Sequence, residues 1–178
     1  MVNRFGKPCV SGVGGNEQEA CLANKSQVSL GRGIFYAKGL RFTCAQCSDC
    51  CRFESGFVFL SKKDTSMLGE ALKLGTKELE KTYCRWIPSQ NGTFRLSLKE
   101  KSNYDCIFWK NGCVVYEYRP LQCRAFPFWP SIVNSEANWE QTGCSCPGVG
   151  KGTLHSREII EKWLALQRKE PIITKGEP

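Results

Sequence analysis

Short aromatic and aliphatic stretches alternate with polar loops along the chain, and several of them have the period of a strand. IFYAKGLRF (residues 34–42) has the composition of an extended segment, and GFVFLS (56–61) that of a short strand. TFRLSLKE (93–100) alternates like a half-buried strand, and CIFWKNGCVVY (106–116) predicts a hairpin that turns at Asn111–Gly112. These segments predict a modest amount of β-structure.

Apolar residues at helical spacing predict helices between these strands. Ser61 with Asp64 resembles a capped helix start, and the residues that follow form one apolar stripe. That stripe consists of Met67, Leu68, Ala71 and Leu72. A second short helix is predicted over residues 76–83, before Pro88 and a turn at Asn91–Gly92.

Two more helices are predicted towards the C-terminus. Pro120 suits the first turn of a short helix that carries Cys123, whereas Pro127 and Pro130 are expected to end any regular helix there. Ser156 is expected to cap a final helix. The buried stripe of this helix is expected to comprise Ile159, Ile160, Trp163 and Leu164.

Residues 1–33 contain six glycines, few large apolar residues and no sustained period of either kind. A segment without an apolar face has no means to bury one, so we predict a flexible arm. Cys9 and Cys21 fall in this arm and are expected to be incidental thiols. The compact part of the chain is then residues 34–178.

Twelve cysteines distinguish this chain of 178 residues. Four of them fall within eight residues: Cys44, Cys47, Cys50 and Cys51. No apolar run of about 18 residues and no signal-like N-terminal stretch is present, so a cytoplasmic location is expected. Dense CxxC spacing in a reducing cytosol indicates metal or redox chemistry. An even number of cysteines also suits a secreted disulfide scaffold, but the missing signal and the adjacent pair argue against that alternative.

The formal net charge of +8 raises the question of a nucleic-acid partner. A four-thiolate site that holds Zn²⁺ or a [4Fe-4S]²⁺ cluster carries a net charge of about −2, so two such sites would lower the excess to roughly +4. The Lys and Arg residues are also scattered along the chain. A nucleic-acid partner is therefore not expected, and neither is a membrane.

The cysteine spacing is compatible with either zinc or an iron-sulfur cluster. The C-x2-C-x2-C part matches the first three ligands of a ferredoxin-type iron-sulfur motif, with Cys146 before Pro147 as a distant fourth, although Cys51 interrupts the usual continuation. CxxC pairs suit tetrahedral zinc equally well. His155 is the only histidine, which excludes His-rich zinc centres and the two-His-one-carboxylate iron site. We interpret His155 as an exposed residue at a helix terminus.

Neighbouring side chains in an extended segment point to opposite sides, so Cys50 and Cys51 are expected to serve two different centres. One hypothesis assigns Cys50 to a centre with Cys44, Cys47 and Cys146. Cys51 would then join Cys106, Cys113 and Cys123, although a bridging thiolate would merge the two. The glycines at 148, 150 and 152 are expected to let backbone N–H groups approach the thiolate of Cys146.

Three segments in this order resemble the YkgJ-type CxxCxxCC family, described as zinc- or iron-chelating proteins. They are FTCAQCSDCC, DCIFWKNGCVVYEYRPLQCRAFPF and CPGVGKG, and the resemblance covers about residues 42–152. It implies as metal ligands Cys44, Cys47, Cys50, Cys51, Cys106, Cys113, Cys123 and Cys146. It also matches the framing residues Tyr116, Arg119, Pro120, Arg124 and Pro127. Many members carry Gly where this chain has Ser48 and Asp49, and Cys144 is an additional candidate ligand.

The resemblance implies zinc or iron as cofactor, with a [4Fe-4S] cluster as one form of the iron. One branch that shares the cysteine pattern, the flagellin lysine N-methylases, is associated with methyl transfer to protein lysines. Three hypotheses follow: an accessory protein with a redox or metal-handling role, a protein-modifying enzyme with a protein substrate, and a zinc-dependent interaction or nucleic-acid-binding module. The expected fold is α+β, a small metal-stabilised single domain with short strands, a hairpin, a few helices and Cys-rich irregular loops.

Overall fold

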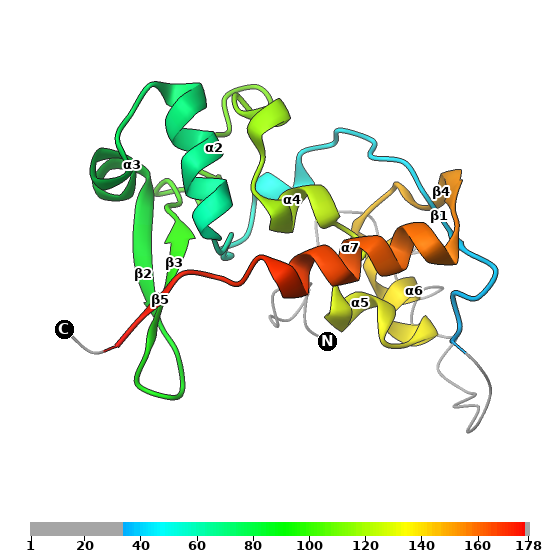
Figure 1. The fold of residues 1–178 in the computed structure, drawn as a ribbon. Helices are drawn as coiled ribbons and strands as arrows, with labels where there is room; N and C mark the ends of the chain where they lie inside the picture. The colour runs from blue at the N-terminus through cyan, green and yellow to red at the C-terminus, as the bar shows by residue number, and fades with distance from the viewer. Residues whose placement is uncertain (1–33, 177–178) are drawn as a thin grey trace. The chain divides into compact units, whose positions relative to one another are not determined.

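The computed structural model describes residues 34–176. These residues divide into two compact units (Figure 1). The first unit comprises residues 34–47 and Pro127–Lys162, and the second comprises Ser48–Phe126 and residues 163–176. Short helices and two small antiparallel sheets confirm the predicted α+β class. The predicted arm, with Cys9 and Cys21, lies outside the described residues, and the arrangement of an arm followed by one metal-binding domain stays a prediction.

The sheet of the second unit is built on a hairpin. Strands β2 (Cys84–Pro88) and β3 (Phe94–Leu98) pair in antiparallel fashion, and β5 (Thr174–Lys175) pairs with the start of β3. The predicted turn at Asn91–Gly92 joins β2 to β3, and the N–H of Ser89 donates to the carbonyl of Thr93 at 2.8 Å. β3 confirms the strand predicted over residues 93–100. β2 was not predicted, because its sequence CRWIP lacks a regular alternation of apolar and polar residues and contains a proline.

The segment GFVFLS runs beside β3 without forming a regular strand. The N–H of Leu60 donates to the carbonyl of Leu96 at 3.0 Å, and the N–H of Leu98 donates to the carbonyl of Val58 at 2.9 Å. A single bridge links Phe59 to Ser97. The prediction of a strand over residues 56–61 was therefore wrong, because the segment forms only isolated contacts with β3. It does, however, lie along β3 and hydrogen-bond to it.

Two predicted helices of the second unit are confirmed. Helix α2 (Lys62–Leu72) begins with a capping box, in which the Ser61 hydroxyl accepts from the N–H of Asp64 and the Asp64 carboxylate accepts from the N–H of Ser61. Helix α3 (Thr76–Tyr83) has the predicted bounds. Asp64 is buried, and its second oxygen accepts the N–H of Leu121 at 2.7 Å. One carboxylate thus ties the start of α2 to the start of α4 (Leu121–Ala125).

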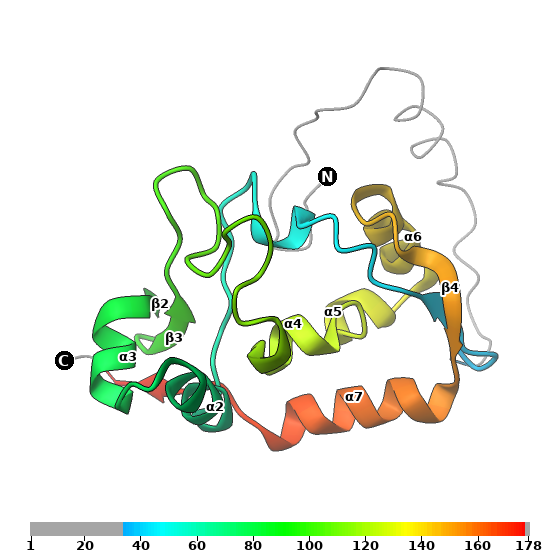
Figure 2. The ribbon, with the colours of Figure 1, turned by 90° about the horizontal axis from the view of Figure 1, so that it is seen from above.

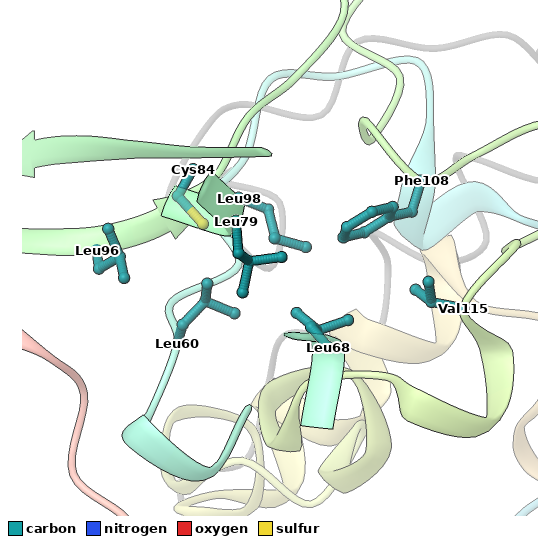
Figure 3. Packing of buried hydrophobic residues seen from close by; sticks show 8 residues of the cluster. All are labelled: Leu60, Leu68, Leu79, Cys84, Leu96, Leu98, Phe108 and Val115. Carbon is teal, nitrogen blue, oxygen red and sulfur yellow. The ribbon is translucent and has the colours of Figure 1, made fainter. Parts of the chain in front are cut away.

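The core of the second unit lies between α2, α3 and the sheet, and Figure 3 shows its side chains converging. It consists of Leu60, Leu68, Leu79, Cys84, Leu96, Leu98, Phe108 and Val115. Phe108 and Val115 come from the cysteine-bearing loop after β3, and both are less than 5% exposed. Burial of their side chains anchors this loop to the core.

In the first unit, β1 (Leu40–Phe42) pairs in antiparallel fashion with β4 (Val149–His155), and α6 (Glu136–Ser145) packs against β4 and α5 (Pro130–Val133) (Figure 2). The extended segment predicted over residues 34–42 is a strand only at its end. Pro130 was expected to end a helix but begins α5 instead, as proline's fixed φ and missing N–H allow at the first helical position.

Helix α7 (Arg157–Lys169) follows Ser156 as predicted, and the division between the two units falls within it, after Lys162. Its buried stripe is narrower than expected, because Ile160 and Leu164 are buried whereas Ile159 is 38% exposed. Ile160 and Leu164 share a face as i, i+4 neighbours, and Ile159 lies about 100° away from it. None of the helices within residues 34–176 has the length and apolar character that a membrane span requires.

Candidate metal centre

Five cysteines of the second unit come from segments far apart in the sequence and lie near enough for their charges to act on one another. They are Cys50 and Cys51 in the 3-10 helix η1 (Asp49–Cys51), Cys106 and Cys113 in the loop after β3, and Cys123 in α4. The charge of at least one other member raises the pKa of each of the four thiols other than Cys50. We call these five residues the thiol cluster.

Cys50 and Cys51 point in the same direction, which corrects the expectation that they would face opposite sides. That expectation assumed an extended backbone, but η1 is a tight turn closed by the N–H of Cys51 donating to the carbonyl of Ser48 at 2.7 Å. The sulfurs of Cys50 and Cys51 are consequently 3.5 Å apart. The turn η1 therefore places the thiols of two adjacent cysteines, Cys50 and Cys51, in the same cluster.

The segments of Cys51 and Cys106 are fastened to each other. The N–H of Cys106 donates to the carbonyl of Cys51 at 2.7 Å, and the Arg52 guanidinium pairs with the buried Asp105 carboxylate at 3.3 Å. Arg52 also stacks over the Trp109 ring, 3.8 Å from its centroid. The ion pair joins the residue after Cys51 to the residue before Cys106. Together these contacts hold in place two candidate metal ligands, Cys51 and Cys106, that are 55 positions apart in the sequence.

The loop that carries Cys106 and Cys113 is partly as predicted. It turns at Asn111 and Gly112, both with positive φ, and a bridge joins Trp109 to Cys113, but no regular hairpin forms. The backbone N–H groups of Phe108 and Val115 donate to the sulfurs of Cys106 and Cys113, respectively, and lower their pKa values. N–H donors two residues after a cysteine stabilise a thiolate, as in the outer shell of metal sites.

Burial and mutual repulsion dominate the electrostatics of the thiol cluster. Burial raises the pKa of Cys106 to about 11, and the charges of Cys113 and Cys50 add to this effect. Burial is also the main cause that raises the pKa of Cys123, followed by the charges of its neighbours, against which Arg119 acts. For Cys51 the largest cause is the hydrogen bond with Cys50, followed by burial. A cation bound among these sulfurs would reverse this balance, because its charge favours the thiolates.

The remaining predicted ligands lie in the first unit. Cys44 and Cys47 are exposed, and Cys146 is half-buried at the end of α6. The N–H of Thr43 donates to the carbonyl of Gly148 at 3.3 Å, which brings the segments of Cys44 and Cys146 side by side. Cys144 is disulfide-bonded and so does not offer a thiolate.

The glycines after Cys146 have a structural use that the sequence did not reveal. A Cβ added at Gly148 would lie 2.2 Å from the carbonyl oxygen of Thr43, and one at Gly152 would lie 2.1 Å from the Thr43 hydroxyl. These glycines therefore permit the close approach of the β1 segment. That their N–H groups serve the thiolate of Cys146 stays a prediction.

His155 is half-buried, which corrects its interpretation as an exposed residue, although it does lie beside Ser156 at the start of α7. It ends β4, is half-buried, and its Nε2 lies 3.0 Å from the carbonyl oxygen of Phe42. Its ring packs edge-on against Phe128, with 5.0 Å between centroids. β4 extends up to residue 155 because of its pairing with β1, and α7 still begins after Ser156 as predicted.

No group of three or more His, Cys, Asp or Glu side chains in residues 34–176 is arranged to hold a metal ion as it stands. The donor types of the thiol cluster nevertheless fit zinc and iron, which thiolates bind well. A metal would draw these sulfurs together, as expected where binding and local folding are coupled.

Cys84 belongs to the second unit but not to the thiol cluster. It is 5% exposed, and burial raises its pKa to about 11, with a further contribution from Glu80 and an opposing one from Lys99. Because the neutral thiol is favoured well above pH 8, Cys84 should react with iodoacetamide at pH 8 about 100-fold more slowly in the folded protein than in urea. Peptide mass spectrometry after timed alkylation measures both rates, and equal rates would contradict this assignment.

Comparison with known proteins places this arrangement in a family. The chain is 30% identical over 145 residues to the uncharacterized protein MJ0661 of Methanocaldococcus jannaschii, which covers 74% of this chain and 75% of that protein. It is 27% identical over 154 residues to the uncharacterized protein MJ0939 of the same organism, which covers 78% of this chain and 50% of that protein. No solved structure matches. The model of the CxxCxxCC family, described as "Putative zinc- or iron-chelating domain", matches residues 43–145, and the chain belongs to this family.

Proposed function

We propose that the protein binds zinc or iron through cysteine thiolates and acts as an accessory protein in metal handling or redox chemistry. The proposed ligands are Cys44, Cys47, Cys50, Cys51, Cys106, Cys113, Cys123 and Cys146. The observation that supports the proposal is the thiol cluster: the sulfurs of Cys50 and Cys51 are 3.5 Å apart, and charges act between cysteines from three separate stretches of the second unit. The family description supports the choice of metals. Metal ions are thus the expected partners, and a protein partner fits a handling role.

The contacts of Cys50 favour a different division of the ligands from the one that spacing suggests. Spacing groups Cys50 with Cys44 and Cys47, but its sulfur lies 3.5 Å from that of Cys51, and its charge acts on the thiols of Cys106 and Cys123. We therefore assign Cys50 to the metal of the second unit. Cys44, Cys47 and Cys146 are then the donors of the first unit.

The thiolate donors suit both zinc and an iron-sulfur cluster, and these differ in colour. An iron-sulfur cluster absorbs visible light, whereas Zn²⁺ has a filled d shell and is colourless. When bound, either group supplies the positive charge that holds buried thiols in their ionised form. A visible spectrum of anaerobically purified protein therefore separates the two forms.

Metal content tests the proposal directly. Protein purified anaerobically should contain about one equivalent or more of zinc or iron by elemental analysis, because the metal contributes to the stability of the loops that bind it. Less than about 0.2 equivalents of both metals would overturn the proposed function. Protein prepared with a chelator and then reloaded with Zn²⁺ serves as the control for loss during purification.

A further inference from the structure

Four arginines of residues 34–176 are half-buried, and two of them are neutralised by a carboxylate. The four are Arg52, Arg85, Arg119 and Arg124. Arg52 pairs with the Asp105 carboxylate at 3.3 Å, and Arg85 pairs with the Glu100 carboxylate at 2.6 Å. The side chains of these two acids are only 6% and 11% exposed. In the second unit a half-buried arginine can therefore be matched by a buried carboxylate.

Arg119 and Arg124 lack such a counter-charge. Neither guanidinium forms an ion pair with a carboxylate of the part of the chain that the structure describes. The Nη2 of Arg124 is buried and donates no hydrogen bond there. A buried charge or donor without a partner costs free energy. We therefore expect an anion to occupy this place in the working protein.

Both guanidinium groups are held in position through their Nε atoms. The Nε of Arg119 donates to the carbonyl of Tyr116 at 2.8 Å, and the Nε of Arg124 donates to the carbonyl of Arg119 at 2.9 Å. The Arg119 guanidinium also lies over the Tyr116 ring, 3.6 Å from its centroid. The terminal nitrogens of the two side chains make no hydrogen bond within residues 34–176. Each fork of N–H donors thus has a fixed place but no acceptor.

The backbone that carries the two arginines is anchored in the core. It runs from η2 (Tyr116–Tyr118) into α4. Between the arginines, Pro120 is fully buried and Leu121 is 4% exposed, and the N–H of Leu121 is held by the buried Asp64 carboxylate. An anion that binds here meets donors already in place, so little side-chain freedom is lost on binding.

We propose that Arg119 and Arg124 bind a phosphate group, at a site separate from the proposed metal ligands and not dependent on the proposed function. The two guanidinium groups carry two positive charges. A phosphate group carries a charge of about −1.5 to −2 at pH 7 and three acceptor oxygens, whereas a carboxylate would neutralise only one arginine. The planar fork of arginine matches the spacing of phosphate oxygens and donates two parallel hydrogen bonds to them.

The experiment uses the full chain, purified anaerobically with its metal, and isothermal titration calorimetry at pH 7. Inorganic phosphate should bind the wild type with a Kd of about 1 mM or lower, and acetate should bind at least about tenfold more weakly. Phenyl phosphate is titrated in the same way. Binding of either phosphate probe supports the site, and the tighter of the two identifies free phosphate or a phosphate ester as its occupant.

Substitutions of the two arginines test their part in binding. Arg119→Gln and Arg124→Gln should each weaken phosphate binding about tenfold or more, because one charge and one fork are lost. Arg124→Lys should also weaken it, since lysine keeps the charge but lacks the fork. The matched control is Arg95→Gln, which removes the same charge from an exposed arginine of the same unit. It should change the Kd by less than about twofold.

The wild-type titration decides the proposal even where a variant does not fold. No heat of binding with either phosphate probe up to about 10 mM would overturn the site. Phosphate affinity that is unchanged in both folded Gln variants would also overturn it, because the anion would then bind the metal or another surface. Acetate binding as tight as that of phosphate would overturn the choice of phosphate as the ligand.

Discussion

Replacing Cys123 by Ser is expected to remove about one equivalent of metal and to lower the unfolding temperature by about 10 °C or more. Burial raises the pKa of the Cys123 thiol most, and the charges of Cys106, Cys50 and Cys113 raise it further, so this thiol is electrostatically coupled to the rest of the cluster. A hydroxyl in its place is a far weaker ligand for zinc or iron. The remaining buried thiols would then lose the cation that favours their ionised form.

Elemental analysis and a thermal scan of the same anaerobic preparation measure the two effects of Cys123→Ser. The matched control is Cys84→Ala, which removes a buried thiol of the same unit and should keep the full metal content. Cys84→Ala loses a small amount of core packing, which affects stability without affecting stoichiometry. A Cys123→Ser variant with wild-type metal content would exclude this residue from the ligands.

The fold could be predicted from the sequence where one local signal sufficed. The capping box at Ser61 and Asp64 marks the start of α2, and Pro120 marks the short helix that carries Cys123. Helix α6 was missed because only Trp139 and Thr142 are buried along it, so no apolar stripe reveals it, although Ser135 does cap its start. Capping residues and prolines mark the starts of these helices in the sequence, whereas a pattern of buried apolar residues alone does not reveal all of them.

The partners of each strand and each cysteine could not be read in the same way. Strand β4 forms by pairing with β1, more than 100 residues earlier in the sequence. Its glycines are typical of a turn, so the sequence does not predict a strand there. The direction of Cys50 depends on whether residues 49–51 form an extended segment or a turn, and an Asp-Cys-Cys sequence favours neither. Spacing identified which cysteines are candidates, but tertiary contacts decide which of them share a unit.

Replacing Phe108 by Ala is expected to destabilise the second unit by about 3–5 kcal/mol and to weaken its hold on metal. Phe108 is 3% exposed and stacks on Tyr83 with 4.9 Å between ring centroids. Its backbone N–H donates to the sulfur of Cys106. Phe108 therefore fills the core with its side chain and stabilises the Cys106 thiolate with its backbone N–H. Without the side chain, the backbone of residue 108 is no longer held in the position from which its N–H donates.

Urea unfolding of the zinc-loaded protein measures the first effect of Phe108→Ala, and competition with a zinc chelator measures the second. The matched control is Val114→Ala in the same loop, because Val114 is 59% exposed and should change the free energy of unfolding by less than about 0.5 kcal/mol. If packing of Phe108 holds Cys106 in place, the loss of zinc affinity in Phe108→Ala should exceed that in Val114→Ala even at low urea, where both variants are folded. Equal zinc affinity in the two variants would show that the core and the thiol cluster are independent.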